Sequence, residues 1–68
     1  MKFESYEGFE GRLVNLYDSL SDIGYGSHAD GNIVTVCDEG DNKIAEFEIE
    51  FTGVNCSDEI KVLSIEEF

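Results

Sequence analysis

The chain has 68 residues, of which 16 are Asp or Glu and 4 are Lys or Arg, so its formal net charge at pH 7 is −12. This length allows one small domain, residues 1–68, and excludes a multidomain enzyme. Affinity for nucleic acid depends on cationic side chains that displace counterions, so the acidic balance argues against direct binding of DNA and against anionic membranes. Leu, Ile, Val and Phe still contribute 20 residues, which favours a folded domain over a disordered acidic tail.

The amino-terminal sequence lacks the features of a targeting signal. It contains no basic segment followed by an apolar run, and no stretch of about eighteen apolar residues occurs anywhere in the chain. The two cysteines, Cys37 and Cys56, do not have the paired spacing of a zinc site, and a single bridge is too little for a disulfide framework. We therefore expect a cytoplasmic protein with reduced thiols.

The amino-terminal third predicts one amphipathic helix. Apolar residues at spacings of four, three, four and three share one helical face: Phe9, Leu13, Leu16, Leu20 and Ile23. The pattern is clearest from residue 11 to residue 23, with Ser5 as a candidate N-cap and Gly24 as a candidate left-handed residue after the last turn. Asp18 and Asp22 lie opposite the apolar stripe, so the outer surface of this helix is expected to be acidic.

Residues 24–32 are rich in turn-forming residues and have no sustained period, so they predict a loop. Three strands are expected after this loop: Ile33 to Cys37, Lys43 to Thr52 and Ile60 to Ile65. A polar turn at residues 39–42 joins the first two, and Gly40 is expected to supply a positive φ there. The predicted fold class is α+β, with the N-terminal amphipathic helix packed on a three-stranded antiparallel β-meander.

The second expected strand has the clearest pattern in the chain. Three glutamates alternate with the apolar residues of its core face: Glu46, Glu48 and Glu50. Carboxylates two residues apart on a strand lie roughly 6.8 Å from one another, twice the strand rise. A solvated sheet face whose like charges prevent edge-to-edge aggregation would explain this row, and so would imitation of a phosphate track on one DNA strand.

The third expected strand is apolar on both faces, because Ile60 and Val62 oppose Leu63 and Ile65. One of these faces would lie under the edge of the helix or in a dimer seam. A domain of this size buries only about 60% of the surface of its unfolded chain, so self-association would add stability. A homodimer and a monomer are therefore both compatible with the sequence.

No arrangement of residues favours catalysis or a cofactor. His28 is the only histidine, and although Asp30 lies close to it in the expected loop, no Ser or Cys has the sequence context of an activated nucleophile. The segment 38–42 offers hard oxygen ligands, but it lacks the spacing of an EF-hand and has the composition of a hairpin turn. We expect a protein that is not an enzyme, with no catalytic residues, no cofactor and no metal site.

The charge density of the chain approaches that of duplex DNA. Compact-domain scaling gives a radius of gyration of about 11 Å and a diameter near 28 Å, and duplex DNA of that length carries roughly sixteen phosphates. Sixteen acidic side chains match that number. Four basic residues cannot compensate them, so the domain generates a field that steers basic surfaces into encounter.

In charge, size and the Glu46-x-Glu48-x-Glu50 row, the chain resembles the small acidic DNA-mimic inhibitors that many bacteriophages encode. Members of this class have no common fold or motif. The resemblance implies a non-catalytic inhibitor in the bacterial host cytoplasm that binds the basic nucleic-acid-binding surface of a host DNA-binding protein. The nucleoid protein HU is the nearest comparison among the targets of this class.

The carboxylates expected to form the partner-binding surface come from all three elements: Glu46, Glu48 and Glu50 on the strand, Asp18 and Asp22 on the helix, and Asp38, Glu39 and Asp41 at the hairpin. Two other classes of protein are compatible with the same charge. An immunity or antitoxin protein would neutralise a basic nuclease toxin, and an acidic adaptor subunit would make few demands on the glutamate row.

Overall fold

The structure is a computed structural model that describes residues 2–54 and 57–68. Its elements in chain order are the 3₁₀ helix η1 (Glu4–Tyr6), β1 (Glu10–Arg12), α1 (Leu13–Asp22), β2 (Gly26–Asp30), β3 (Ile33–Cys37), β4 (Lys43–Phe51) and β5 (Glu59–Glu67). The five strands form one antiparallel sheet in the order β1-β5-β4-β3-β2. The α+β class is confirmed, but the expected three-stranded meander omits β1 and β2. In the part of the chain that is described, neither helix has the length and apolar character needed to traverse a bilayer.

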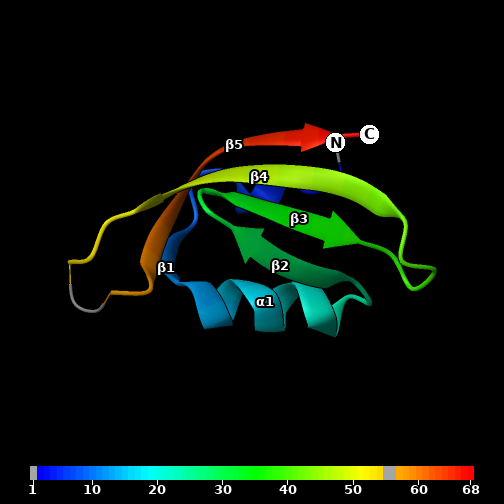
Figure 1. The fold of residues 1–68 in the computed structure, drawn as a ribbon, viewed down its shortest axis with the longest axis horizontal. Coiled ribbons are helices and arrows are strands. Elements are labelled where there is room, and N and C mark those ends of the chain that lie inside the picture. Colours follow the sequence, from blue (N-terminus) through cyan, green and yellow to red (C-terminus); the bar gives the residue numbers. More distant parts are fainter. Residues whose placement is uncertain (1, 55–56) are drawn as a thin grey trace.

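The sheet curves into a half-barrel, and α1 lies along its open side (Figure 1). The helix contacts both edge strands, β2 and β1. The chain segment before β1 continues the pairing of β1 with β5. There the Gly8 N–H donates to the Val62 carbonyl at 3.1 Å, and the Val62 N–H donates to the Phe9 carbonyl at 2.8 Å. Covered edges of this kind limit strand addition by other chains.

The hydrophobic core fills the space between α1 and the inner face of the sheet. The prediction of a shared apolar helix face is confirmed for Leu16 and Leu20, which are buried in α1. Leu13 is partly buried, but Ile23 is 54% exposed and Phe9 precedes the helix. Phe3 joins them from the amino-terminal segment, and its ring meets Phe47 at a centroid distance of 5.7 Å and Tyr25 at 5.3 Å, both edge to face. The buried core consists of Phe3, Leu16, Leu20, Val34, Val36, Ala45, Phe47, Ile49, Ile60 and Val62.

The helix begins later than the sequence predicted. Residues 10–12 pair with β5 instead, through Glu10 opposite Lys61 and Arg12 opposite Glu59, and this pairing holds them extended. The N-cap of α1 is Arg12, without a side-chain capping bond, so the expected cap at Ser5 is wrong. The helix end is as predicted, because Gly24 has a φ of 90° and donates its N–H to the Ser21 carbonyl at 3.0 Å.

The expected loop at residues 24–32 is wrong over its central part, which forms β2. This strand pairs antiparallel with β3 across a two-residue turn, Gly31-Asn32. Gly31 has a φ of 65°, and it occupies the first central position, where a type II′ hairpin turn favours glycine. Every second residue of β2 is half-buried, although the strand carries almost no apolar side chains.

The turn between β3 and β4 also differs from the expectation in one respect. Asp41, with a φ of 65°, takes the left-handed conformation that was assigned to Gly40. The Asp38 carboxylate determines this geometry, because its Oδ1 accepts the Gly40 N–H at 2.9 Å and the Asn42 N–H at 3.0 Å. Aspartate tolerates the left-handed region better than most residues, so the turn needs no glycine there.

A register shift in β5 changes which of its residues are buried. Val62 lies opposite Ile49 and Ser64 lies opposite Glu48, so the β5 strand has one extra residue, Leu63, at this point. Ile60, Val62 and Ile65 consequently all contribute to the core, whereas Leu63 is 45% exposed. The sequence suggested a second apolar face of this strand that could form a dimer seam. In β5, Leu63 is the one residue of that face that stays exposed.

Candidate acidic binding surface

The glutamate row lies on the outer face of the sheet. The apolar residues of β4 are buried against the helix, and the strand pleat turns the residues between them away from the core. The structure therefore places Glu46, Glu48 and Glu50 on one face, as the alternation predicted. β4 is the third of five strands, so this row runs along the middle of the sheet.

Strand pairing adds a fourth carboxylate to this row. Glu66 of β5 lies directly opposite Glu46, while Glu48 is opposite Ser64 and Glu50 is opposite Lys61. Side chains directly opposite in an antiparallel pair have Cβ atoms about 4.5–5.5 Å apart, and like charges in that position are destabilising. We call Glu46, Glu48, Glu50 and Glu66 the outer acidic face. Sequence reasoning missed Glu66, because its position opposite Glu46 depends on the register of β5.

Part of the outer acidic face is hollowed. A shallow hollow of about 210 Å³ is lined by Ile33, Glu46, Glu48, Ser64 and Glu66. Within it, the Ser64 hydroxyl donates to Glu48 Oε1 at 3.1 Å. Ser64 is a neutral donor, so this hydrogen bond orients the Glu48 carboxylate without neutralising it.

Basic residues lie at the two ends of the outer acidic face. At one end, Lys43 Nζ lies 2.9 Å from Glu46 Oε2, and this contact raises the pKa of Lys43. At the other end, Lys61 Nζ lies 3.7 Å from Glu10 Oε1. Both contacts are solvent-exposed, where ion pairs contribute little to stability. With four carboxylates and two lysines, the face remains negative, and the charge is least compensated around Glu48 and Glu66.

The remaining predicted residues do not continue this face. Asp18 and Asp22 lie on α1, whose buried residues point into the core from the side opposite the outer sheet face. Asp38, Glu39 and Asp41 belong to the turn between β3 and β4, at one end of the sheet. The eight predicted carboxylates are thus divided between the outer sheet face, the helix and the turn.

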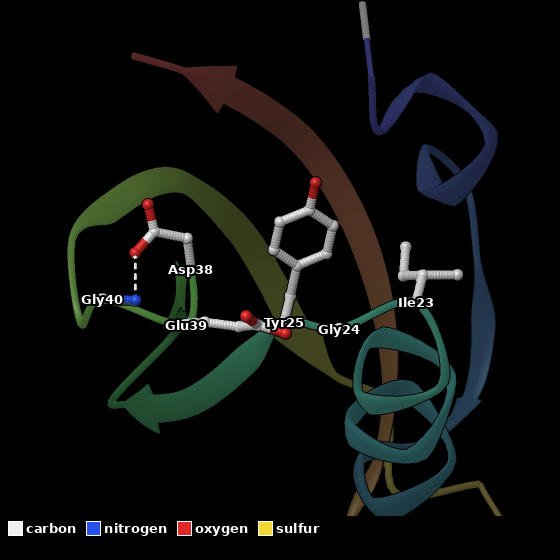
Figure 2. Close-up of a pocket in the computed structure, with 6 residues that line it drawn as sticks. All are labelled: Ile23, Gly24, Tyr25, Asp38, Glu39 and Gly40. Atoms are coloured by element: carbon white, nitrogen blue, oxygen red, sulfur yellow. Dashed lines mark hydrogen bonds between the residues drawn. The ribbon is translucent and has the colours of Figure 1, made fainter.

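A second hollow lies between this turn and the end of α1. It has a volume of about 400 Å³ and is lined by Ile23, Gly24, Tyr25, Asp38, Glu39 and Gly40. Figure 2 shows Asp38 and Tyr25 on either side, with Glu39 extending toward the backbone of Gly24 and Tyr25. The backbone N–H of Asn42, supported by the Asn42 side chain and the Gly40 N–H, holds the pKa of Asp38 below its ordinary value. Sequence reasoning included Asp38 and Glu39 but missed Ile23 and Tyr25 as their neighbours.

His28 lies on β2 opposite Thr35 and is exposed, so its expected position in a loop is wrong. Cys37 is half-buried on β3, and Cys56 lies outside the described residues. Within residues 2–54 and 57–68, no group of three or more His, Cys, Asp or Glu side chains is arranged to hold a metal ion.

Comparisons with known proteins add no relative to this picture. No protein-family model matches the chain, and neither the curated proteins nor the solved structures contain a match. The charge, register and shape of the domain are therefore the observations from which a function can be argued.

Proposed function

We propose that this protein is a non-catalytic DNA mimic that binds the basic nucleic-acid-binding surface of a bacterial DNA-binding protein and blocks its binding to DNA. The observation that carries the proposal is the outer acidic face, where Glu46 and Glu66 lie directly opposite each other on adjacent strands. Like charges directly opposite are unfavourable in a sheet, and Lys43 offsets part of this cost through its contact with Glu46. The remaining cost of the pair favours a role outside the fold. Protection of a sheet edge does not account for it, because β4 is the central strand.

The spacing of the carboxylates supports a comparison with phosphates. Neighbouring glutamates are separated by roughly 6.8 Å along β4 and by about 5 Å across the strands. Phosphates on one DNA strand advance 3.4 Å along the helix axis and lie farther apart along the inclined backbone. The outer acidic face therefore offers a basic groove a density of negative charge similar to that of a DNA backbone.

The size of the domain supports the same comparison. Its principal extents are 34 × 21 × 18 Å and its radius of gyration is 11.1 Å, close to the value expected from its length. A duplex of 34 Å is about one helical turn and carries about 20 phosphates, compared with 16 acidic residues here. A groove that accommodates one turn of duplex could accommodate this domain.

The proposed partner is a nucleoid protein that binds double-stranded DNA in the cytoplasm of a bacterial host. The resemblance to DNA-mimic inhibitors suggests a protein of the HU type. Steering between the acidic domain and such a surface would be fast at low salt and would weaken as salt rises. Direct contact with nucleic acid is not expected, because both molecules are polyanions.

A capture experiment tests the proposal. Tagged protein is passed through nuclease-treated bacterial lysate at moderate salt, and stoichiometric partners are identified by mass spectrometry with and without added duplex DNA. We expect a DNA-binding protein that duplex DNA releases. A partner that DNA does not release would contradict mimicry and favour an immunity protein or an adaptor.

A pair of charge-matched variants tests the surface. Replacing Glu46, Glu48 and Glu50 by Gln removes three charges from the outer acidic face, whereas replacing Asp18, Asp22 and Asp41 by Asn removes three charges from the helix and the turn. Exposed charge pairs contribute about 0.2–1 kcal/mol each, so removing three should lower the affinity for the captured partner by about three- to 150-fold. The second variant should lose much less. Equal losses would indicate that only total charge matters.

A further inference from the structure

The hollow between α1 and the turn after β3 combines three kinds of wall. Glu39 and Asp38 supply carboxylates, Tyr25 supplies an aromatic ring, and Ile23, which is 54% exposed, supplies an apolar side chain. The carboxyl-terminal end of α1 adds the negative pole of the helix dipole. All of these features favour a cation that carries an apolar stem.

The structure already contains one example of this recognition. Lys2 Nζ lies 5.4 Å from the centroid of the Tyr25 ring, so the ring accepts an ammonium group of the chain itself, and an arginine that stacks on the ring has to displace Lys2. Tyr25 is held in place from the core side by Phe3, at a centroid distance of 5.3 Å. The aromatic wall is therefore fixed before a partner arrives.

The carboxylates of the hollow differ in how they are held. Asp38 is fixed by the hydrogen bonds of its Oδ1 to the turn backbone, including the Gly40 bond drawn in Figure 2. Glu39 reaches from the turn toward the end of α1, where a Cβ atom added to Gly24 would lie 3.9 Å from Glu39 Oε1. A ligand in the hollow would thus meet one rigid carboxylate and one that can adjust.

We propose that this hollow receives a single arginine side chain of the basic partner, an inference that rests on the proposed function. The guanidinium would stack on Tyr25 and donate hydrogen bonds to Glu39, and its methylene stem would lie against Ile23. Arginine fits better than lysine, because its planar group can stack on a ring and bind a carboxylate through two donors at once. The turn that lines the hollow leads directly into β4, whose fourth residue is Glu46, so one partner can reach both.

The first test uses a small probe in place of the partner. Nα-acetyl-arginine amide is titrated into ¹⁵N-labelled protein, with Nα-acetyl-lysine amide and NaCl at equal ionic strength as comparisons. We expect saturable amide shifts at Gly24, Tyr25, Glu39 and Gly40 with the arginine derivative, and weaker shifts with the lysine derivative. Equal responses to both derivatives would overturn the preference for arginine. Shifts distributed equally over the outer acidic face would overturn the site.

A matched pair of variants completes the test. Glu39→Gln removes the adjustable carboxylate, and Asp41→Asn removes the same charge from the same turn without changing the lining of the hollow. Glu39→Gln should weaken binding of the arginine derivative by about three- to fivefold, and Asp41→Asn should change it by less than about twofold. Equal effects would overturn the site. Since the probe is independent of the partner, failure here is distinguishable from failure of DNA mimicry, which the capture experiment tests.

Discussion

The opposition of Glu46 and Glu66 predicts that replacing Glu66 by Lys stabilises the fold while weakening binding of a basic partner. The substitution changes a directly opposed like-charge pair into an opposite-charge pair. Each cross-strand contribution is about 0.2–1 kcal/mol, so removing repulsion and adding attraction should raise the free energy of unfolding by about 1 kcal/mol. For a domain of this length, 1 kcal/mol corresponds to roughly 4–8 °C in Tm. Lys43, 2.9 Å from Glu46, already compensates part of the repulsion, so a much larger effect is not expected.

Glu50→Lys is the control for this prediction. It makes the same change in net charge on the same face, but it places the new lysine opposite Lys61. Relief of overall self-repulsion would favour both variants equally, whereas the cross-strand term favours only Glu66→Lys. Urea unfolding and thermal unfolding at low salt measure the difference. If the two variants have the same stability, the local pair is not a source of strain and the argument from its unfavourable position is refuted.

Two further predictions concern the backbone at Gly31 and the loss of stability at acidic pH. Replacing Gly31 by Ala should destabilise the domain by about 1–2 kcal/mol, because the φ of 65° there is unfavourable for a residue with a side chain, even though the surrounding space is open. Gly26 also lies in open space but has no positive φ, so Gly26→Ala should be neutral or slightly stabilising. Thermal unfolding of both variants measures the difference. The Phe3 N–H, 2.9 Å from Glu67 Oε2, holds the pKa of Glu67 below its ordinary value of 4.5. That interaction therefore stabilises the fold above pH 4.5, and its contribution is lost as the pH falls through the lower folded pKa of Glu67. In Glu67→Gln this loss cannot occur, so the free energy of unfolding, measured with urea, should change less with pH below 4.5 than in the parent protein. An unchanged slope in Glu67→Gln would contradict this assignment.

The sequence predicted those elements in which polar and apolar residues alternate strongly. In β4, three glutamates alternate with buried apolar residues, and a period of two defines both the strand and its charged face. In α1, Leu16 and Leu20 lie at helical spacing and are buried as predicted. Alternation indicates the face of an element directly, so the outer position of Glu46, Glu48 and Glu50 could be inferred without a structure.

β2 could not be predicted in this way, because its stability comes from pairing. Its five residues, Gly26 to Asp30, contain one apolar side chain and three residues typical of turns. Pairing with β3 through the Gly31-Asn32 turn and contact with α1 hold it in the sheet. β1 is similar, since only pairing with β5 distinguishes residues 10–12 from the start of the helix. Tertiary contacts decided the structure of both segments against their local preference.

The same distinction applies to the candidate surface. A strand pattern indicates which carboxylates share a face of that strand, but the extra residue at Leu63 determines which β5 side chain lies opposite each one. Without that shift, Glu66 would lie on the other face of the sheet from Glu46, because one residue of register reverses the direction of every side chain. The four-carboxylate face therefore depends on the accommodation of Leu63 as a bulge. Deleting Leu63 would remove the extra residue and leave a regular ladder, with Val62 opposite Ile49, Ser64 opposite Glu48 and Glu66 still opposite Glu46, so the outer acidic face would keep all four carboxylates.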